Sequence, residues 1–158
     1  MSTEHTDNVT IAKLENLKHI HEVRAYLYAM ISELDKRARD HDASKLESPE
    51  AEVYGEHFHE LATVKYGTPE YEALTQKVKP ALDNHYAKNR HHPQHWPNGV
   101  DDMTVIDLVE MLCDWKASTQ RNKDGNLRKS IAVNAKRFKI GRQLTNIFQN
   151  TVREMFQE

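Results

Sequence analysis

This chain has little cysteine and no excess of positive charge, and it contains no long apolar run. Its one cysteine, Cys113, cannot form an intrachain disulfide, which predicts a protein of a reducing compartment such as the cytoplasm. The 22 basic residues are outnumbered by 24 acidic ones, so nothing favours non-specific binding to nucleic acid or to anionic membranes. The N-terminal "MSTEHTDNVT" lacks the apolar core of a signal peptide. We therefore expect a cytoplasmic protein without a membrane partner.

Apolar residues are also scarce. They make up 38% of the chain against 29% charged residues, which predicts a thin core beneath a highly charged surface. A length of 158 residues is enough for one compact domain and too short for two, so we expect a single domain over residues 1–158. The basic run "KRFKIGR" is typical of a solvated helix end and gives no strong nucleic-acid signal.

Helical periodicity dominates the chain. From about residue 10 to about residue 37, apolar residues recur at helical spacing and predict an amphipathic helix. A second helix is predicted to start at Ser48 as N-cap and to close at Gly67. A third helix is predicted to begin with the same kind of N-cap at Thr68 and to kink or split at Pro80.

Residues 89–103 read as a loop, and Thr104 with Asp107 three positions later resembles a capping box that starts the next helix. Two more helical segments follow the turn "KDGN". The sequence shows no convincing strand pair, so the expected class is all-α, a compact bundle of about six helices.

Histidines and carboxylates gather in a pattern that suits a metal. "NHYAKNRHHPQHW" holds four histidines, and "HD" at His41 and Asp42 places two further nitrogen and oxygen ligands side by side. His19 lies at the inward border of the first helix. Each signal alone is weak, since isolated histidines are more often exposed or satisfied core residues. His95 is better explained as an exposed polar residue than as a ligand.

The helix after Thr104 is apolar almost all round, yet it carries three acidic residues at a spacing of three and four. Carboxylates on a buried helix must be paired, hydrogen-bonded or bound to metal. A purely structural interpretation makes Asp107 the helix cap and pairs Glu110 with a basic side chain. Asp114 is the hardest to explain in this way and is the preferred metal ligand.

The order of these motifs resembles the HD superfamily of metal-dependent phosphohydrolases, whose all-α core holds one or more metals. "HIHEV" is similar to the first motif, "HDASK" to the second, and the aspartate of "EMLCDW" to the closing one. The stretches "HDASKLESPE", "YGTPEY", "NHYAKNRHHPQHWPNGVDDM" and "DLVEMLCDWKAS" are also similar to a small bacterial and bacteriophage family of unknown function. The resemblance implies these metal ligands: His19, His41, Asp42, His85, His91, His92 and Asp114.

The superfamily resemblance implies hydrolysis of a nucleotide or similar small phosphoester through a metal-activated water. Lys45 and Arg90 are expected to neutralise phosphate oxygens, and either Glu110 or Asp107 is expected to act as general base or to orient a ligand histidine. The expected cofactor is one or two divalent transition-metal ions, with Mn, Fe, Zn, Co and Ni not distinguished. The sequence leaves homo-oligomerisation open.

Two alternatives remain. An HD-fold di-iron oxygenase would use the same histidine and aspartate ligands to activate O₂. A non-catalytic helical interaction protein with a structural metal site would keep the buried polar cluster without turnover.

Overall fold

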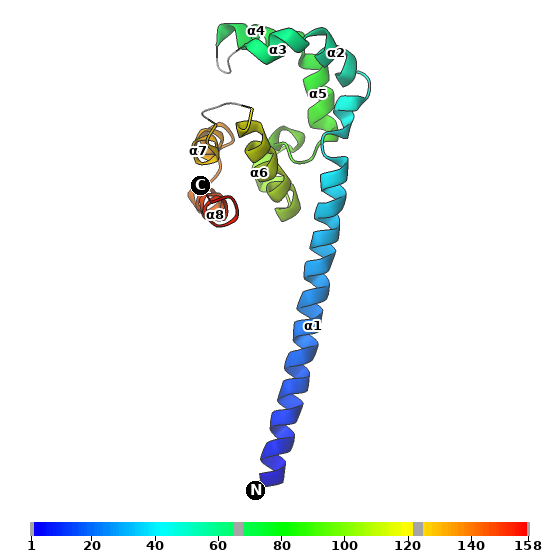
Figure 1. Cartoon of the computed structure of the whole chain (residues 1–158), viewed down its shortest axis with the longest axis vertical. Helices are drawn as coiled ribbons and strands as arrows, with labels where there is room; N and C mark the ends of the chain where they lie inside the picture. Colours follow the sequence, from blue (N-terminus) through cyan, green and yellow to red (C-terminus); the bar gives the residue numbers. More distant parts are fainter. Residues whose placement is uncertain (1, 65–67, 122–124, 158) are drawn as a thin grey trace. The chain divides into compact units, whose positions relative to one another are not determined.

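The computed structural model describes residues 2–64, 68–121 and 125–157, with side chains from residue 7 onward. In these ranges the chain forms eight α-helices and three short 3₁₀-helices and contains no strand (Figure 1). The expected all-α class is therefore confirmed, with slightly more helices than the six predicted. No helix in the described ranges has both the length and the apolar character that crossing a bilayer requires.

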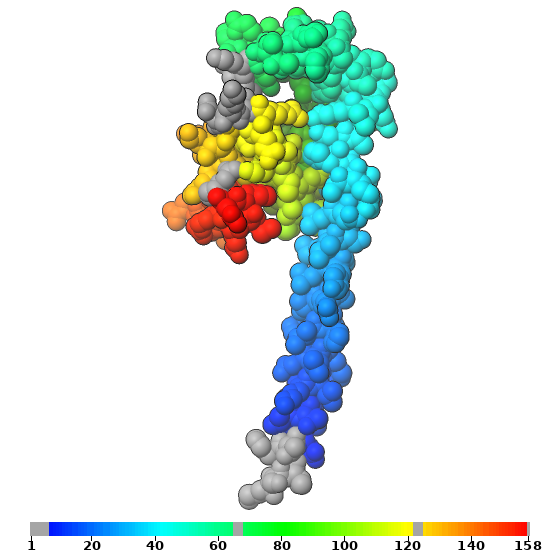
Figure 2. Space-filling view, in the orientation of Figure 1, coloured from blue at the N-terminus to red at the C-terminus, as the bar shows by residue number. Residues whose placement is uncertain are grey.

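The chain divides into two compact units, Met1–Arg39 and Asp40–Glu158. The first unit consists of helix α1 (Ser2–Asp40), which starts before and ends after the predicted range of residues 10–37. The space-filling view shows the side chains that surround this helix (Figure 2). Ion pairs between successive turns stabilise the helix, such as the pair of Lys18 and Glu15 at 2.6 Å. The single domain expected over residues 1–158 stays a prediction.

The second unit begins with η1 (Ala43–Leu46), α2 (Glu50–Glu56) and α3 (Phe58–Thr63). The single helix predicted from Ser48 is wrong in two respects. Pro49 occupies the N-cap position, and no side chain caps this helix start. The helix also breaks at His57, whose backbone leaves the helical region. The predicted end at Gly67 lies outside the described residues.

The predicted start at Thr68 and the predicted break at Pro80 are both confirmed. Helix α4 (Pro69–Lys77) is capped by the Thr68 hydroxyl, which accepts a hydrogen bond from the backbone N–H of Tyr71 at 3.3 Å. Helix α5 (Lys79–Lys88) begins after Val78, because Pro80 has no N–H with which to continue the α4 hydrogen-bond ladder. Helix α2 packs against α5.

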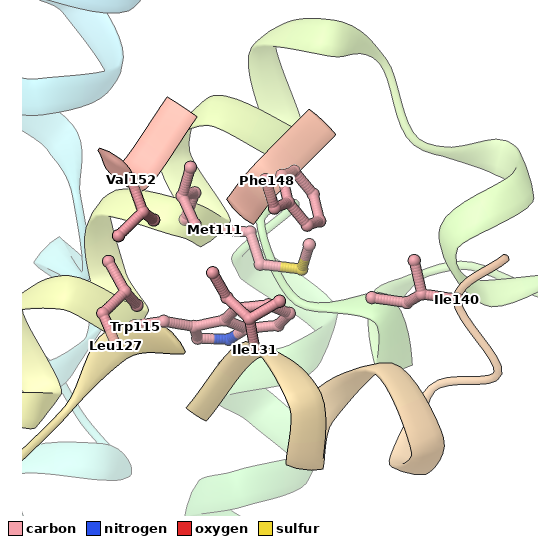
Figure 3. Close-up of a cluster of buried hydrophobic side chains, with 8 residues drawn as sticks. Met111, Trp115, Leu127, Ile131, Ile140, Phe148 and Val152 are labelled. Carbon is pink, nitrogen blue, oxygen red and sulfur yellow. The ribbon is translucent and has the colours of Figure 1, made fainter. Parts of the chain in front are cut away.

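After α5 the chain forms η2 (Pro93–His95) and η3 (Gly99–Asp102), then α6 (Val105–Thr119), α7 (Leu127–Arg137) and α8 (Arg142–Met155). The capping box of Thr104 and Asp107 is confirmed. Helices α6 and α8 both pack against α7. The buried side chains of these helices and of the α7–α8 connection, most of which Figure 3 labels, form one core: Met111, Leu112, Trp115, Leu127, Ile131, Ile140, Phe148 and Val152. This core holds α6 in place, and with it Glu110 and Asp114.

Candidate metal centre

Seven side chains of the second unit form three overlapping groups of potential metal ligands. Within each group, one nitrogen or oxygen atom of every residue lies within 4.8 Å of the others. The centre group consists of Asp42, His85, His91 and His92. Two further groups adjoin it: His41, Asp42 and Asp114; and His41, His91 and Glu110.

His41 and Asp42 reach the same centre because the backbone turns sharply between them and the following helix. Helix α1 ends at Asp40, and Asp42 then adopts a left-handed conformation with φ 55° and ψ 18°. Aspartate is one of the few residues that tolerates this region. From a regular helix, neighbouring side chains would diverge by about 100°. The left-handed residue removes that constraint and brings both side chains to the site.

The other members of the centre group come from α5 and the loop that follows it. His85 is almost fully buried in the last turn of α5, and His91 is 1% exposed in the loop. Asn89 joins the two segments: its side-chain amide donates to the backbone oxygen of His85 at 2.8 Å and to the hydroxyl of Ser44 at 2.7 Å. The Asn89 amide thus ties the loop to both α5 and η1.

Glu50 determines which nitrogen of His85 faces the centre. The Glu50 carboxylate is completely buried, and its Oε2 lies 2.8 Å from His85 Nδ1. An ionised carboxylate can only accept, so the His85 ring carries its proton on Nδ1 and leaves Nε2 as a lone-pair donor atom. The side-chain amide of Asn84 donates to the other oxygen of Glu50 at 2.7 Å. This carboxylate–histidine pairing is the arrangement that orients histidine ligands in metal sites.

Glu110 orients two other histidines of these groups through their Nδ1 atoms. Its Oε1 lies 2.9 Å from His41 Nδ1 and 3.0 Å from His91 Nδ1. The His41 ring therefore donates through Nδ1, and the same carboxylate favours a proton on Nδ1 of His91, which leaves both Nε2 atoms unprotonated when the rings are neutral. His41 Nε2 lies 3.6 Å from Asp42 and 4.0 Å from Asp114. The hydrogen bond to Glu110 raises the pKa of His41, against the lowering effect of burial.

Asp42, His85 and His91 of the centre group turn hydrogen-bond acceptors toward one another. Asp42 Oδ1 lies 3.3 Å from His85 Nε2 and 3.5 Å from His91 Nε2. Asp42 Oδ1 and His91 Nε2 are buried and have no hydrogen-bond partner among the described residues. Leaving a buried polar atom unsatisfied costs about 1–3 kcal/mol. Ligand atoms about 2.1 Å from a common ion would lie about 3.0–3.4 Å apart at octahedral or tetrahedral angles. The donor set and its spacing fit a divalent cation.

His92 completes this group, with its Nε2 2.8 Å from that of His85. Burial, together with the neighbouring rings of His91 and His85, lowers the pKa of His92 to about 3. Burial likewise lowers the pKa of His85. Both rings are therefore neutral at physiological pH, which is the form that binds metal.

Asp42 belongs to both the centre group and the group with His41 and Asp114. Its Oδ1 faces His85 and His91, while its Oδ2 lies 2.6 Å from the ammonium of Lys45. Burial would raise the pKa of Asp42, but the hydrogen bond and charge of Lys45 outweigh it and lower that pKa. The two oxygens of one carboxylate are thus directed to different partners.

The structure brings together six of the seven ligands predicted from the sequence: His41, Asp42, His85, His91, His92 and Asp114. His19 lies on α1 in the first unit, so its role as a ligand stays a prediction. His95, which was not expected to be a ligand, hydrogen-bonds through Nδ1 to the backbone oxygen of Tyr86 at 2.8 Å.

The residues predicted to contact phosphate have partners within the protein. Lys45 is paired with Asp42, as described above. The Arg90 guanidinium donates to Asp107 at 3.2 and 3.3 Å and lies 4.6 Å from the ring centroid of Trp96. Since Asp107 caps α6, Arg90 ties the histidine-bearing loop to the start of the helix that carries Glu110.

Sequence reasoning missed Glu50 and Asn84. Glu50 follows Ser48-Pro49 and looked like an acidic residue of the first helical turn, where acids are common. Its partner His85 lies 35 positions further along the chain. No local pattern could reveal this pairing.

Residues 10–158 match a family described as a family of unknown function (DUF5662). No curated protein and no solved structure matches the chain.

Proposed function

The chain belongs to this family of unknown function, and we propose from its candidate metal centre that it is a metal-dependent phosphohydrolase acting on a nucleotide or similar small phosphoester. The observation that carries the proposal is the pair of buried, unsatisfied atoms Asp42 Oδ1 and His91 Nε2, 3.5 Å apart. Both are acceptors in the tautomer that Glu110 imposes. No proton lies between them, so a cation is the partner that their chemistry calls for.

The residues that would hold a divalent ion are Asp42, His85, His91 and His92. A second ion would be held by His41, Asp42 and Asp114, with Asp42 shared through its two oxygens. Three histidines and carboxylates are the ligand set of zinc, iron and manganese sites that perform hydrolysis or redox chemistry. A bound divalent ion supplies Lewis acidity toward water and phosphate oxygens.

The chain's own residues prepare the site for that chemistry. Glu50 and Glu110 hold protons on Nδ1 of three histidine rings, so that each Nε2 keeps its lone pair toward the centre. Asp114 is half-buried, which leaves the group with His41 accessible from solvent. Lys45 pairs with Asp42 Oδ2 and lowers the pKa of that carboxyl, which keeps it ionised beside the histidines.

Elemental analysis of the purified full-length protein, joined to a screen of nucleotides and other phosphoesters, tests this function. We expect stoichiometric divalent metal and metal-dependent release of phosphate or of a phosphate-containing product. Asp42→Asn keeps the size of the side chain and its tolerance for the left-handed backbone, and it should abolish both results. His59→Ala, which removes an exposed histidine of α3, should change neither.

Different outcomes point to different functions. A wild-type protein without metal, even after incubation with each candidate divalent ion, rules out the hydrolase. Two irons and a turnover that requires O₂ would instead identify the oxygenase. Stoichiometric metal with no turnover of any phosphoester would favour a structural site in an interaction protein.

A further inference from the structure

A cavity of about 440 Å³ lies directly against the candidate metal centre. Its wall includes His92 of the centre group and Asp114 of the adjoining group. The remaining wall comes from α5, from α6, from α7 and its C-cap Phe138, and from the segment around η2. Small-molecule sites occupy about 300–1,000 Å³ and are lined by apolar and aromatic groups with a few polar ones. The volume and position of this cavity suit the substrate of the metal centre.

The composition of the wall suits an uncharged, partly aromatic body with one anionic group. Tyr86, Trp115 and Phe138 supply aromatic surface, and the rings of Trp115 and Phe138 are nearly parallel, with an interplanar angle of 8°. The neutral hydrogen-bonding residues of the wall are Gln94, Ser118, Ser130 and Asn134. Such groups orient a ligand through hydrogen bonds without contributing net charge.

Arg137 alone among the described lining residues carries a fixed positive charge. It shares one face of α7 with Ser130 and Asn134, at spacings of seven and three residues. Its guanidinium carbon lies 4.8 Å from the ring centroid of Phe138, which holds the planar group beside the cavity. Arg137 and Tyr86 also line a neighbouring cavity of about 400 Å³, so the guanidinium stands where the two hollows meet.

The cations expected from the sequence are already engaged. Lys45 is bound to Asp42 and Arg90 to Asp107. No ion pair joins Arg137 to a carboxylate within the described ranges, which leaves its planar donor fork available for a phosphate.

We propose that this cavity binds the substrate of the metal centre and that Arg137 binds an anionic oxygen of the substrate's phosphoryl group. The inference rests on the proposed function and adds to it the residue that recognises the phosphate. Asp114 and His92 border the cavity on the side of the metal groups, and Arg137 contributes from α7. A phosphoester in the cavity thus meets the metal ligands and the cation together.

Calorimetric titration of the Mn²⁺-loaded full-length protein with inorganic phosphate tests the role of Arg137. Arg137→Gln should weaken phosphate binding by roughly 10-fold or more, the range expected for losing hydrogen bonds to a charged group. The matched control Lys136→Gln makes the same charge change at the adjacent, exposed position, which lines neither cavity, and should alter the affinity by less than about 2-fold. Thermal unfolding should be the same for both variants.

A second variant tests the cavity itself. Val133 is 56% exposed on the same wall, so Val133→Trp adds bulk there without disturbing the core. It should weaken binding of adenosine monophosphate at least 10-fold while leaving the affinity for inorganic phosphate nearly unchanged. Equal affinity of adenosine monophosphate for wild type and Val133→Trp overturns the cavity assignment.

Metal content is measured in every sample, because it separates the two proposals. A metal-loaded wild type that does not bind phosphate, or an Arg137→Gln variant that binds it as tightly as wild type, overturns the role of Arg137 and leaves the metal centre standing. A wild type without metal refutes the proposed function, and the cavity inference fails with it.

Discussion

Replacing Glu50 by glutamine tests whether a buried carboxylate determines the histidine tautomer at the candidate metal centre. Glu50 is completely buried and makes two short contacts, 2.8 Å to His85 Nδ1 and 2.7 Å to Asn84 Nδ2. Both of these partners donate, so both oxygens of the carboxylate are needed. Glutamine keeps the shape but offers one oxygen, which leaves one donor without an acceptor. The free energy of unfolding should fall by about 1–3 kcal/mol.

Metal affinity should fall as well, since His85 loses the acceptor that keeps its Nε2 free of a proton. Loss of such an orienting partner typically reduces metal affinity 10–100-fold. Glu50→Ala should be more severe, because it leaves a buried cavity and removes the acceptors of both His85 and Asn84; we expect about 3–5 kcal/mol of lost stability. Competition with a chelating indicator gives the affinity, and urea unfolding of the metal-free protein gives the stability.

Glu52→Gln is the matched control, because Glu52 is exposed on the same helix two residues further on. It should change metal affinity by less than about 2-fold and stability by less than about 0.5 kcal/mol. If Glu50→Gln lowers stability yet binds metal as tightly as wild type, Glu50 serves only the packing of α2 on α5. The tautomer argument for His85 would then be refuted.

Three further measurements bear on the site and the fold. A metal ion at 100 times its dissociation constant stabilises a protein by about 2.7 kcal/mol, so chelation should lower Tm by about 5–10 °C, and His91→Ala should remove this difference. The pKa of His92 is about 3 in the folded chain against 6.5 for the free side chain, so the unfolded chain takes up a proton on His92 at a higher pH than the folded chain does. The stability of the metal-free protein should therefore fall as the pH drops below about 6.5. In urea unfolding, His92→Asn should flatten this pH dependence between about pH 7 and pH 5. Thr104→Ala removes the hydroxyl that accepts from the backbone N–H of Asp107, and should lower the unfolding free energy by about 1 kcal/mol; unchanged stability would show that the cap contributes nothing.

The parts of the fold that follow from the sequence are those governed by local backbone rules. Thr104 with Asp107 marked a capping box, and Pro80 marked a helix break, because each acts within about one turn of helix. The break at His57 carries no comparable signal: neither proline nor a strong cap stands there. The sequence around it is helical on both sides, so two short helices were predicted as one.

The cluster of candidate ligands could be predicted from the sequence, and Glu110 was expected as an orienting residue, but Glu50 was not. Histidines and an aspartate on a buried helix are unusual enough to indicate a metal from residue types alone. The residues that orient them are ordinary acids whose importance depends on partners far along the chain. Glu50 meets His85 across 35 positions and His41 meets Glu110 across 69. Arg90 was expected at the substrate for its charge, and only the fold shows that Asp107 holds it.

The left-handed conformation of Asp42 also limits which residues could replace it. A backbone with φ 55° and ψ 18° is readily adopted by glycine, asparagine and aspartate, and among these three only aspartate carries a carboxylate. Position 42 is thus restricted twice, once by the backbone conformation and once by the chemistry of the side chain.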